Sequence, residues 1–187
     1  MYKMRAFGSA VVVGLALTLS GAQASAVPGL PSGSSEVVTP TAESISAAFP
    51  RLVPQSAESE IGYRGATCWQ TDRGYVPSAN AGDPEFGNWA WQWRCYGGGD
   101  GNDPLYRIYA YHSAVDVQSV VAALPPSSVT TDLNHGRAYT NHQYTNNGNK
   151  IITTFSGDAQ RATFLMFTDG YGTPDEVMNW WRDAPLN

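Results

Sequence analysis

The chain is poor in positive charge, in cysteine and in histidine. Its 187 residues contain 11 lysines and arginines against 16 aspartates and glutamates, with two cysteines and three histidines. The formal net charge of −5 disfavours nucleic-acid binding, because lysine and arginine are needed to neutralise phosphates. It also disfavours attachment to anionic membrane surfaces. We therefore expect no nucleic-acid partner.

The short motifs of common hydrolases, nucleotide-binding proteins and zinc enzymes are also missing. Neither H-E-x-x-H, nor G-x-S-x-G, nor a Walker loop occurs in the sequence. His112, His135 and His142 are the only residues of the type that exchanges protons near neutral pH. We predict no catalytic residue, no metal ion and no cofactor. The alternative is a small secreted hydrolase that pairs one of these histidines with a carboxylate such as Asp132.

Long apolar runs are absent except near the N-terminus. Ala10–Leu19 is apolar but shorter than the ~20 residues that a membrane-spanning helix needs. It follows Lys3 and Arg5 and precedes small-x-small cleavage signals within residues 22–26. This pattern is typical of a secretory signal peptide, so we predict that residues 1–26 are removed on export. No cysteine follows the run closely, so we expect a secreted, extracellular protein with neither a lipid anchor nor a membrane span after signal cleavage.

The chain that remains after signal cleavage, residues 27–187, has the length of one domain. Residues 27–40 are rich in proline, glycine and serine and are expected to form a flexible spacer. Residues 41–187 are long enough for one substantial core but not for two full domains. We therefore predict a single globular domain over residues 41–187.

Cys68 and Cys95 both lie in segments with strand-like patterns. In an exported chain, an even number of cysteines favours a disulfide, and two buried free thiols are the alternative. Closing the loop between them stabilises the fold by about 3–4 kcal/mol, because it restricts the unfolded chain. We predict a Cys68–Cys95 disulfide.

The densest aromatic stretch is Trp89–Tyr111, whose alternating pattern indicates two strands joined at a glycine-rich turn. A period of two places Trp89, Trp91 and Trp93 on the same face as Cys95, where we expect core packing. The other face carries five arginines and tyrosines: Arg94, Tyr96, Arg107, Tyr109 and Tyr111. If no helix covers this face, it is suited to binding a glycan, peptide or protein. If helices cover both faces, the five residues belong to a second layer of core.

The rest of the chain alternates between helix and strand patterns. Helices are predicted to begin near Thr41, Ser113 and Thr173, and each ends at a proline. Strands are predicted at residues 65–71, 89–96, 105–111, 136–145, 150–155 and 162–168. The order is α-βββ-α-βββ-α. Because strands joined by short turns pair antiparallel and amphipathic helices must cover a sheet, we predict an α+β fold, with an antiparallel sheet of about six strands covered by two or three helices.

Two of these helices share a pattern. Residues 117–125 read V-x-x-V-V-x-x-L-P, and residues 177–185 read V-x-x-W-W-x-x-A-P. This similarity indicates either an internal duplication of a βββα unit or two ordinary amphipathic helices with similar ends. The order of elements resembles that of the Mog1/PsbP-like α/β/α sandwiches, which occur among small exported actinobacterial proteins. The resemblance implies a sandwich fold and assigns no functional residue.

Gly98–Tyr106 matches the calcium-binding nonapeptide G-G-x-G-x-D-x-U-x at every defined position. The motif occurs once, whereas calcium needs 6–8 oxygen ligands that repeated copies normally share. Asp83 and Glu85 would have to fold back to complete a site. We therefore interpret this stretch as a hairpin loop, and a calcium site is the alternative.

No specific activity follows from these patterns. Six tryptophans and ten tyrosines are a high aromatic content, and both residue types are common anchors at binding surfaces. We expect a disulfide-stabilised extracellular module that binds a protein, peptide or glycan without catalysis.

Overall fold

The computed structural model describes residues 39–56, 58–73, 83–99 and 101–187. All of these residues belong to one compact unit, Glu36–Asn187. The predicted signal peptide and most of the predicted spacer lie outside the described residues.

Three α-helices, one short 3₁₀ turn and seven strands form the described part of the chain. In chain order they are α1 (Ala42–Ala48), η1 (Tyr63–Gly65), β1 (Thr67–Asp72), β2 (Trp89–Tyr96), β3 (Leu105–Tyr111), α2 (Ala114–Ala122), β4 (Ser128–Asn134), β5 (Arg137–Thr145), β6 (Asn149–Thr154), β7 (Phe164–Gly170) and α3 (Pro174–Asp183).

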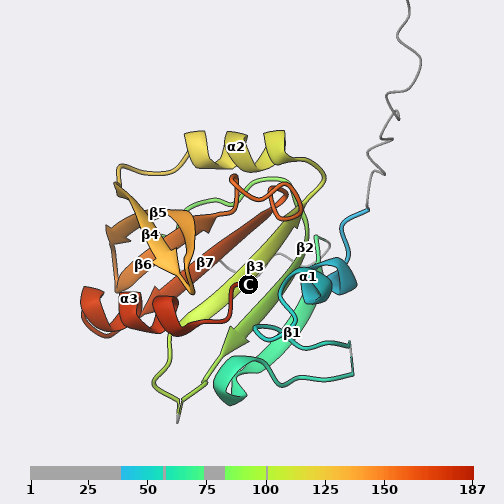
Figure 1. Ribbon diagram of the computed structural model, residues 1–187, viewed down its shortest axis with the longest axis horizontal. Helices are drawn as coiled ribbons and strands as arrows, with labels where there is room; N and C mark the ends of the chain where they lie inside the picture. The colour runs from blue at the N-terminus through green and yellow to red at the C-terminus, as the bar shows by residue number, and fades with distance from the viewer. Residues whose placement is uncertain (1–38, 57, 74–82, 100) are drawn as a thin grey trace, which may run out of the picture. The chain divides into compact units, whose positions relative to one another are not determined.

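The strands form one antiparallel sheet with the order β1-β2-β3-β7-β6-β5-β4 (Figure 1). The two halves of the chain therefore meet at the centre, where β3 pairs with β7. This arrangement confirms the predicted α+β class and the antiparallel sheet.

The observed order of elements differs from the prediction by one strand, β4. The second half of the chain reads ββββ, because Ser128–Asn134 pairs with β5 along its whole length. This strand is at the edge of the sheet, and six of its seven residues are exposed or half-buried. An edge strand of this kind needs no apolar pattern, so periodicity did not reveal it.

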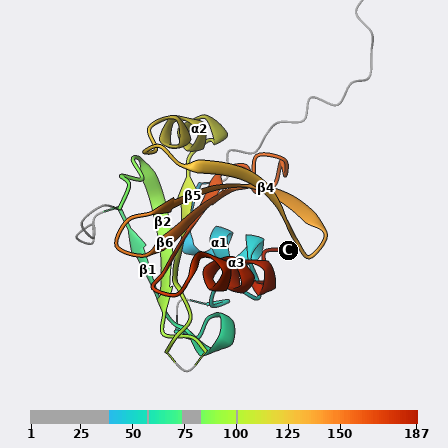
Figure 2. The ribbon, with the colours of Figure 1, turned by 90° about the vertical axis from the view of Figure 1, so that its left-hand side faces the viewer.

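Helices cover both faces of the sheet (Figure 2). Helices α1 and α3 pack on one face, which we call the α1/α3 face. Helix α2 packs on the other, the α2 face. The two helices with the shared sequence pattern, α2 and α3, thus lie on opposite faces. Duplication of a βββα unit about a two-fold axis between β3 and β7 would place them on the same face.

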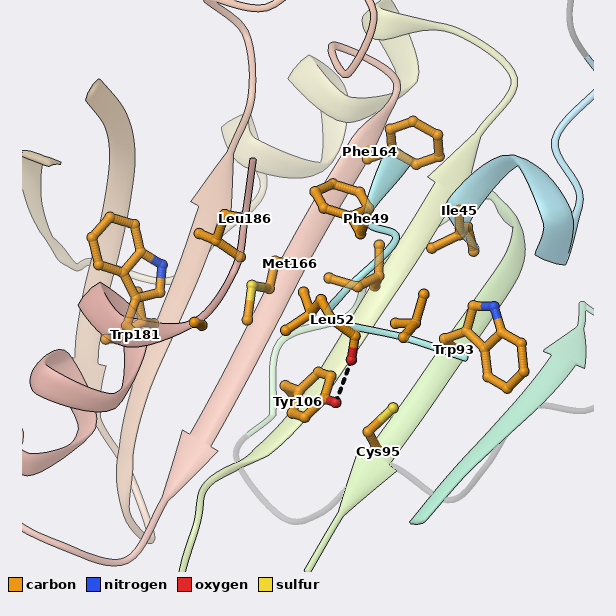
Figure 3. Close-up of a cluster of buried hydrophobic side chains, with 14 of the residues drawn as sticks. Ile45, Phe49, Leu52, Trp93, Cys95, Tyr106, Phe164, Met166, Trp181 and Leu186 are labelled. Carbon is orange, nitrogen blue, oxygen red and sulfur yellow. Dashed lines mark hydrogen bonds between the residues drawn. The ribbon is translucent and has the colours of Figure 1, made fainter. Parts of the chain in front are cut away.

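The larger core lies between the sheet and helices α1 and α3. Ile45, Phe49, Trp93 and Trp181 are among its buried side chains. Figure 3 shows part of this core, where the buried Tyr106 hydroxyl donates a hydrogen bond of 2.7 Å to the Leu52 carbonyl. This contact fixes the segment after α1 against the sheet.

The predicted disulfide is present between Cys68 of β1 and Cys95 of β2. The two cysteines are directly paired across the strands, and both side chains are buried in the α1/α3 core. The bond therefore joins the edge strand β1 to the interior of the sheet.

The tryptophans of β2 do not all face the same way. A bulge lies between Trp89 and Trp91. Trp89 pairs with Tyr111, and Trp91, two residues later, pairs with Ala110, which is only one residue away from Tyr111. An extra residue in one strand reverses the alternation of side chains beyond it. Trp89 therefore packs in the α2 cluster, whereas Trp93 lies in the α1/α3 core as predicted. The prediction of a single tryptophan face was wrong for Trp89.

Candidate functional site

An open groove of about 1490 Å³ runs along the end of the sheet that holds the β2–β3 loop. We call it the end groove. Strands β1 and β2 line one part of it, through Trp69, Gln92, Arg94 and Tyr96. The β2–β3 loop, the β7–α3 connection and α3 line the remainder. The groove is thus built from segments far apart in the sequence.

Two aromatic rings on the strand side of the groove are stacked. The ring centroids of Trp69 and Tyr96 lie 4.6 Å apart, and the rings are within 15° of parallel. Both stay accessible, with 40% of Trp69 and 45% of Tyr96 exposed. Tyr171, on the β7–α3 connection, also lines the groove and is 90% exposed.

The five predicted binding residues share one face of the β2–β3 hairpin, but they differ in accessibility. Arg94 is half-buried and Tyr96 is exposed, and both line the end groove. Arg107, Tyr109 and Tyr111 are buried. These three lie beneath the α2 side of the molecule, where the Tyr111 hydroxyl donates a hydrogen bond of 2.8 Å to the Phe86 carbonyl. The accessible part of the predicted surface is therefore its Arg94–Tyr96 end.

Charged side chains are buried beside the groove, on the α2 face. The Lys150 ammonium lies 2.8 Å from the Asp169 carboxylate and 3.5 Å from the Asp83 carboxylate. All three side chains are almost completely buried. Asp83 is a candidate ligand of the alternative calcium site, but its carboxylate faces a lysine. The triad connects β6, β7 and the segment before β2.

Arg107 adds a second cation to this interior. It is 4% exposed, and its guanidinium lies 5.7 Å from the centre of the Phe167 ring. One of its nitrogens donates a hydrogen bond of 3.4 Å to the Tyr109 hydroxyl, while Nε and the other terminal nitrogen have no hydrogen-bond partner. Burial raises the pKa of the Tyr109 hydroxyl, so the tyrosine accepts this bond as a neutral phenol.

The polar side chains of the groove are partly occupied by contacts within the protein. The Gln92 amide donates a hydrogen bond of 2.8 Å to the Thr71 hydroxyl. Its carbonyl oxygen is buried and has no partner. In the β2–β3 loop, Asp103 forms an ion pair of 3.2 Å with Arg64. The groove therefore holds at least one buried acceptor that no described residue satisfies.

The glycine-rich loop of the calcium-type motif forms the turn between β2 and β3. Gly99 and Gly101 have positive φ angles, which glycine adopts without steric cost. A side chain at Gly99 would also collide with the Asp103 carboxylate. Asp100 lies outside the described residues. In the part of the chain that the structure describes, no three His, Cys, Asp or Glu side chains are grouped as metal ligands.

The three histidines are dispersed. The His135 ring lies 3.3 Å from a backbone carbonyl near the end of α3, and His112 is exposed. His142 is on the α2 face of β5, paired with a residue of the α2 cluster, and burial lowers its pKa. Asp132 instead accepts a hydrogen bond of 3.0 Å from Asn141, which belongs to the α1/α3 face. Among the described residues, no histidine forms an ion pair with a carboxylate.

Sequence patterns alone had not identified Trp69, Gln92 or Tyr171 as site residues. Trp69 follows the disulfide cysteine Cys68 directly, so its period-two position opposite the core could have indicated an outward face. Tyr171 follows a strand without any pattern that would reveal its exposure. No helix within the described ranges is long and apolar enough to cross a membrane.

Comparisons of the chain with protein-family models, curated proteins and solved structures found no significant match.

Proposed function

We propose that the protein is a secreted, non-catalytic binding module whose ligand lies in the end groove. One observation carries this proposal. Seven large hydrophobic residues are exposed in the described part of the chain, three of them aromatic, and all three aromatics line the groove: Trp69, Tyr96 and Tyr171. Exposed aromatic side chains that gather in a depression are typical of binding sites, because covering them with a ligand removes a large apolar area from water.

The residues predicted from the sequence contribute to this site at one end. Arg94 and Tyr96 lie beside Trp69 on the sheet, so a ligand at this end can contact an aromatic pair and a guanidinium. Such combinations are frequent at the energetic centres of protein interfaces. Arg107, Tyr109 and Tyr111 are buried and do not line the groove, so they are not part of the proposed contact surface.

Export is the second part of the proposal. The Cys68–Cys95 disulfide supports it, because disulfides persist mainly in oxidising compartments outside the cytosol. Expression of the full chain in a bacterial host is expected to yield an exported form that begins near residue 27, as measured by intact mass. Retention of residues 1–26 in the exported form would contradict the predicted cleavage.

The binding proposal is tested with the processed chain on arrays of glycans and of peptides. Trp69→Ala and Tyr96→Ala are each expected to weaken array binding about tenfold or more without changing the melting temperature. Leu133→Ala is the matched control, because Leu133 is 65% exposed but does not line the groove. The mass of the recovered ligand is expected to be unchanged. Conversion of the ligand to a product would show that the module is catalytic.

A further inference from the structure

Two of the aromatic rings in the end groove are stacked on each other, and each keeps part of its surface accessible. Trp69 and Tyr96 are stacked at 4.6 Å and nearly parallel, and more than a third of each side chain is exposed. The face of an aromatic ring carries partial negative charge. The axial C–H groups on one face of a sugar ring carry partial positive charge, so a sugar ring packs favourably against an exposed aromatic face.

Four amide side chains line the groove: Gln70, Gln92, Asn102 and Asn179. Of the two on the strands, Gln92 shares the sheet face of Trp69 and Tyr96. An amide presents donors and an acceptor in one plane, which suits hydroxyl groups, since each hydroxyl both donates and accepts. The buried carbonyl oxygen of Gln92 has no hydrogen-bond partner, although buried polar atoms in folded proteins almost always have one. A ligand hydroxyl would supply the missing donor.

The lining has few aliphatic side chains and more negative than positive charges. Its only aliphatic side chains, among the described residues, are Pro104, Leu105 and Val177. Its charged residues are two arginines and four carboxylates: Arg64, Arg94, Asp103, Asp169, Glu176 and Asp183. The excess of negative charge would repel sulfated or uronic sugars. A neutral ligand avoids this cost.

The size of the groove indicates a chain rather than a single small molecule. Sites for small molecules commonly enclose about 300–1,000 Å³, and the end groove exceeds this range at about 1490 Å³. Tyr171 provides a further exposed ring on the β7–α3 connection, apart from the Trp69–Tyr96 pair. A ligand of several units can therefore contact both aromatic sites.

We infer that the end groove binds a neutral polysaccharide. Trp69 and Tyr96 stack against sugar rings, Gln92 accepts a hydrogen bond from a hydroxyl, and Tyr171 contacts a further unit of the same chain. This inference rests on the proposed function, because it names the ligand class of the same groove.

Affinity electrophoresis tests the inference with the processed chain. Native gels each contain one soluble polysaccharide: hydroxyethyl cellulose, galactomannan, dextran, glycogen or carboxymethyl cellulose. At least one neutral polysaccharide is expected to retard the protein, and Trp69→Ala should weaken that binding about tenfold or more. Gln92→Met, which keeps the side-chain volume and removes the acceptor, should weaken it to a smaller extent. Leu133→Ala should migrate like the wild type.

The outcomes separate the ligand class from the site. If no neutral polysaccharide retards the protein and it binds a peptide in a manner that requires Trp69, the polysaccharide inference is wrong and the proposed function still holds. Carboxymethyl cellulose and hydroxyethyl cellulose share one backbone, but only the first is anionic. Stronger retardation by carboxymethyl cellulose would therefore contradict the inference that the ligand is neutral. If Trp69→Ala changes no binding to any polysaccharide or peptide, both the inference and the proposed function fail.

Discussion

The two faces of the sheet bury polar groups in different ways. On the α1/α3 face, they form a continuous chain of hydrogen bonds: Trp181 donates to Thr153 at 2.8 Å, and Thr153 donates to Asn141 at 2.7 Å. On the α2 face, Lys150 sits between two carboxylates, and Arg107 keeps two nitrogens without partners. Hydrogen bonds between neutral groups favour one rigid arrangement, whereas buried charges are costly unless they are balanced. We therefore expect hydrogen-bonded packing to dominate stability on the α1/α3 face and charge balance to matter more on the α2 face.

Trp181→Ala tests the stabilising role of the α1/α3 face and should have the largest effect. Trp181 is fully buried, so its loss leaves a cavity and removes the donor to Thr153. We expect a loss of about 3–5 kcal/mol in the free energy of unfolding, measured by urea denaturation. Trp69→Ala is the control on the exposed side, and an equal loss there would contradict the contrast between the faces.

Lys150→Met tests whether the α2 face depends on balanced charge. The substitution leaves the buried carboxylates of Asp83 and Asp169 without their cation, which should cost about 3–5 kcal/mol. The triple variant Lys150→Met, Asp83→Asn, Asp169→Asn removes all three charges and should recover much of that loss. Equal instability of the single and triple variants in urea titrations would show that shape, rather than charge, determines this site.

Removal of the disulfide should have a somewhat smaller effect. Cys68→Ala with Cys95→Ala frees a loop with a sequence separation of 27, and the chain-entropy model gives a loss of about 3–4 kcal/mol. The loss in free energy of unfolding in this variant can be compared with the loss that reduction of the disulfide causes in the wild type. If the bridge acts only through the unfolded chain, binding at the neighbouring Trp69–Tyr96 pair should persist in the folded variant.

The smallest expected effect is the pH dependence due to His142. Burial lowers the pKa of this histidine in the folded protein, so the unfolded chain binds a proton more readily. Stability should therefore be fully present above the unfolded pKa and should decrease as the pH falls from about 7.5 to about 5. In His142→Gln, this part of the decrease should be absent when urea midpoints are compared. A steeper decrease of stability with falling pH in His142→Gln than in the wild type would contradict the predicted direction of this effect.

Several features were determined by the sequence alone because they depend on neighbouring residues. The caps at Ser113 and Thr173 were recognised from local spacing, and both hydroxyls accept hydrogen bonds from backbone N–H groups three residues later. Alternation placed Trp93 and Cys95 in the core. The cysteine count predicted the disulfide.

Only the tertiary structure decided which parts of these patterns are accessible. One extra residue in β2 turned Trp89 to the opposite face, and packing of α2 buried Tyr109 and Tyr111. The end groove joins Trp69 to Tyr171, which are separated by most of the domain. Periodicity describes the direction of a side chain relative to its own strand. Burial depends on what covers that strand, and here the covering elements come from distant parts of the chain.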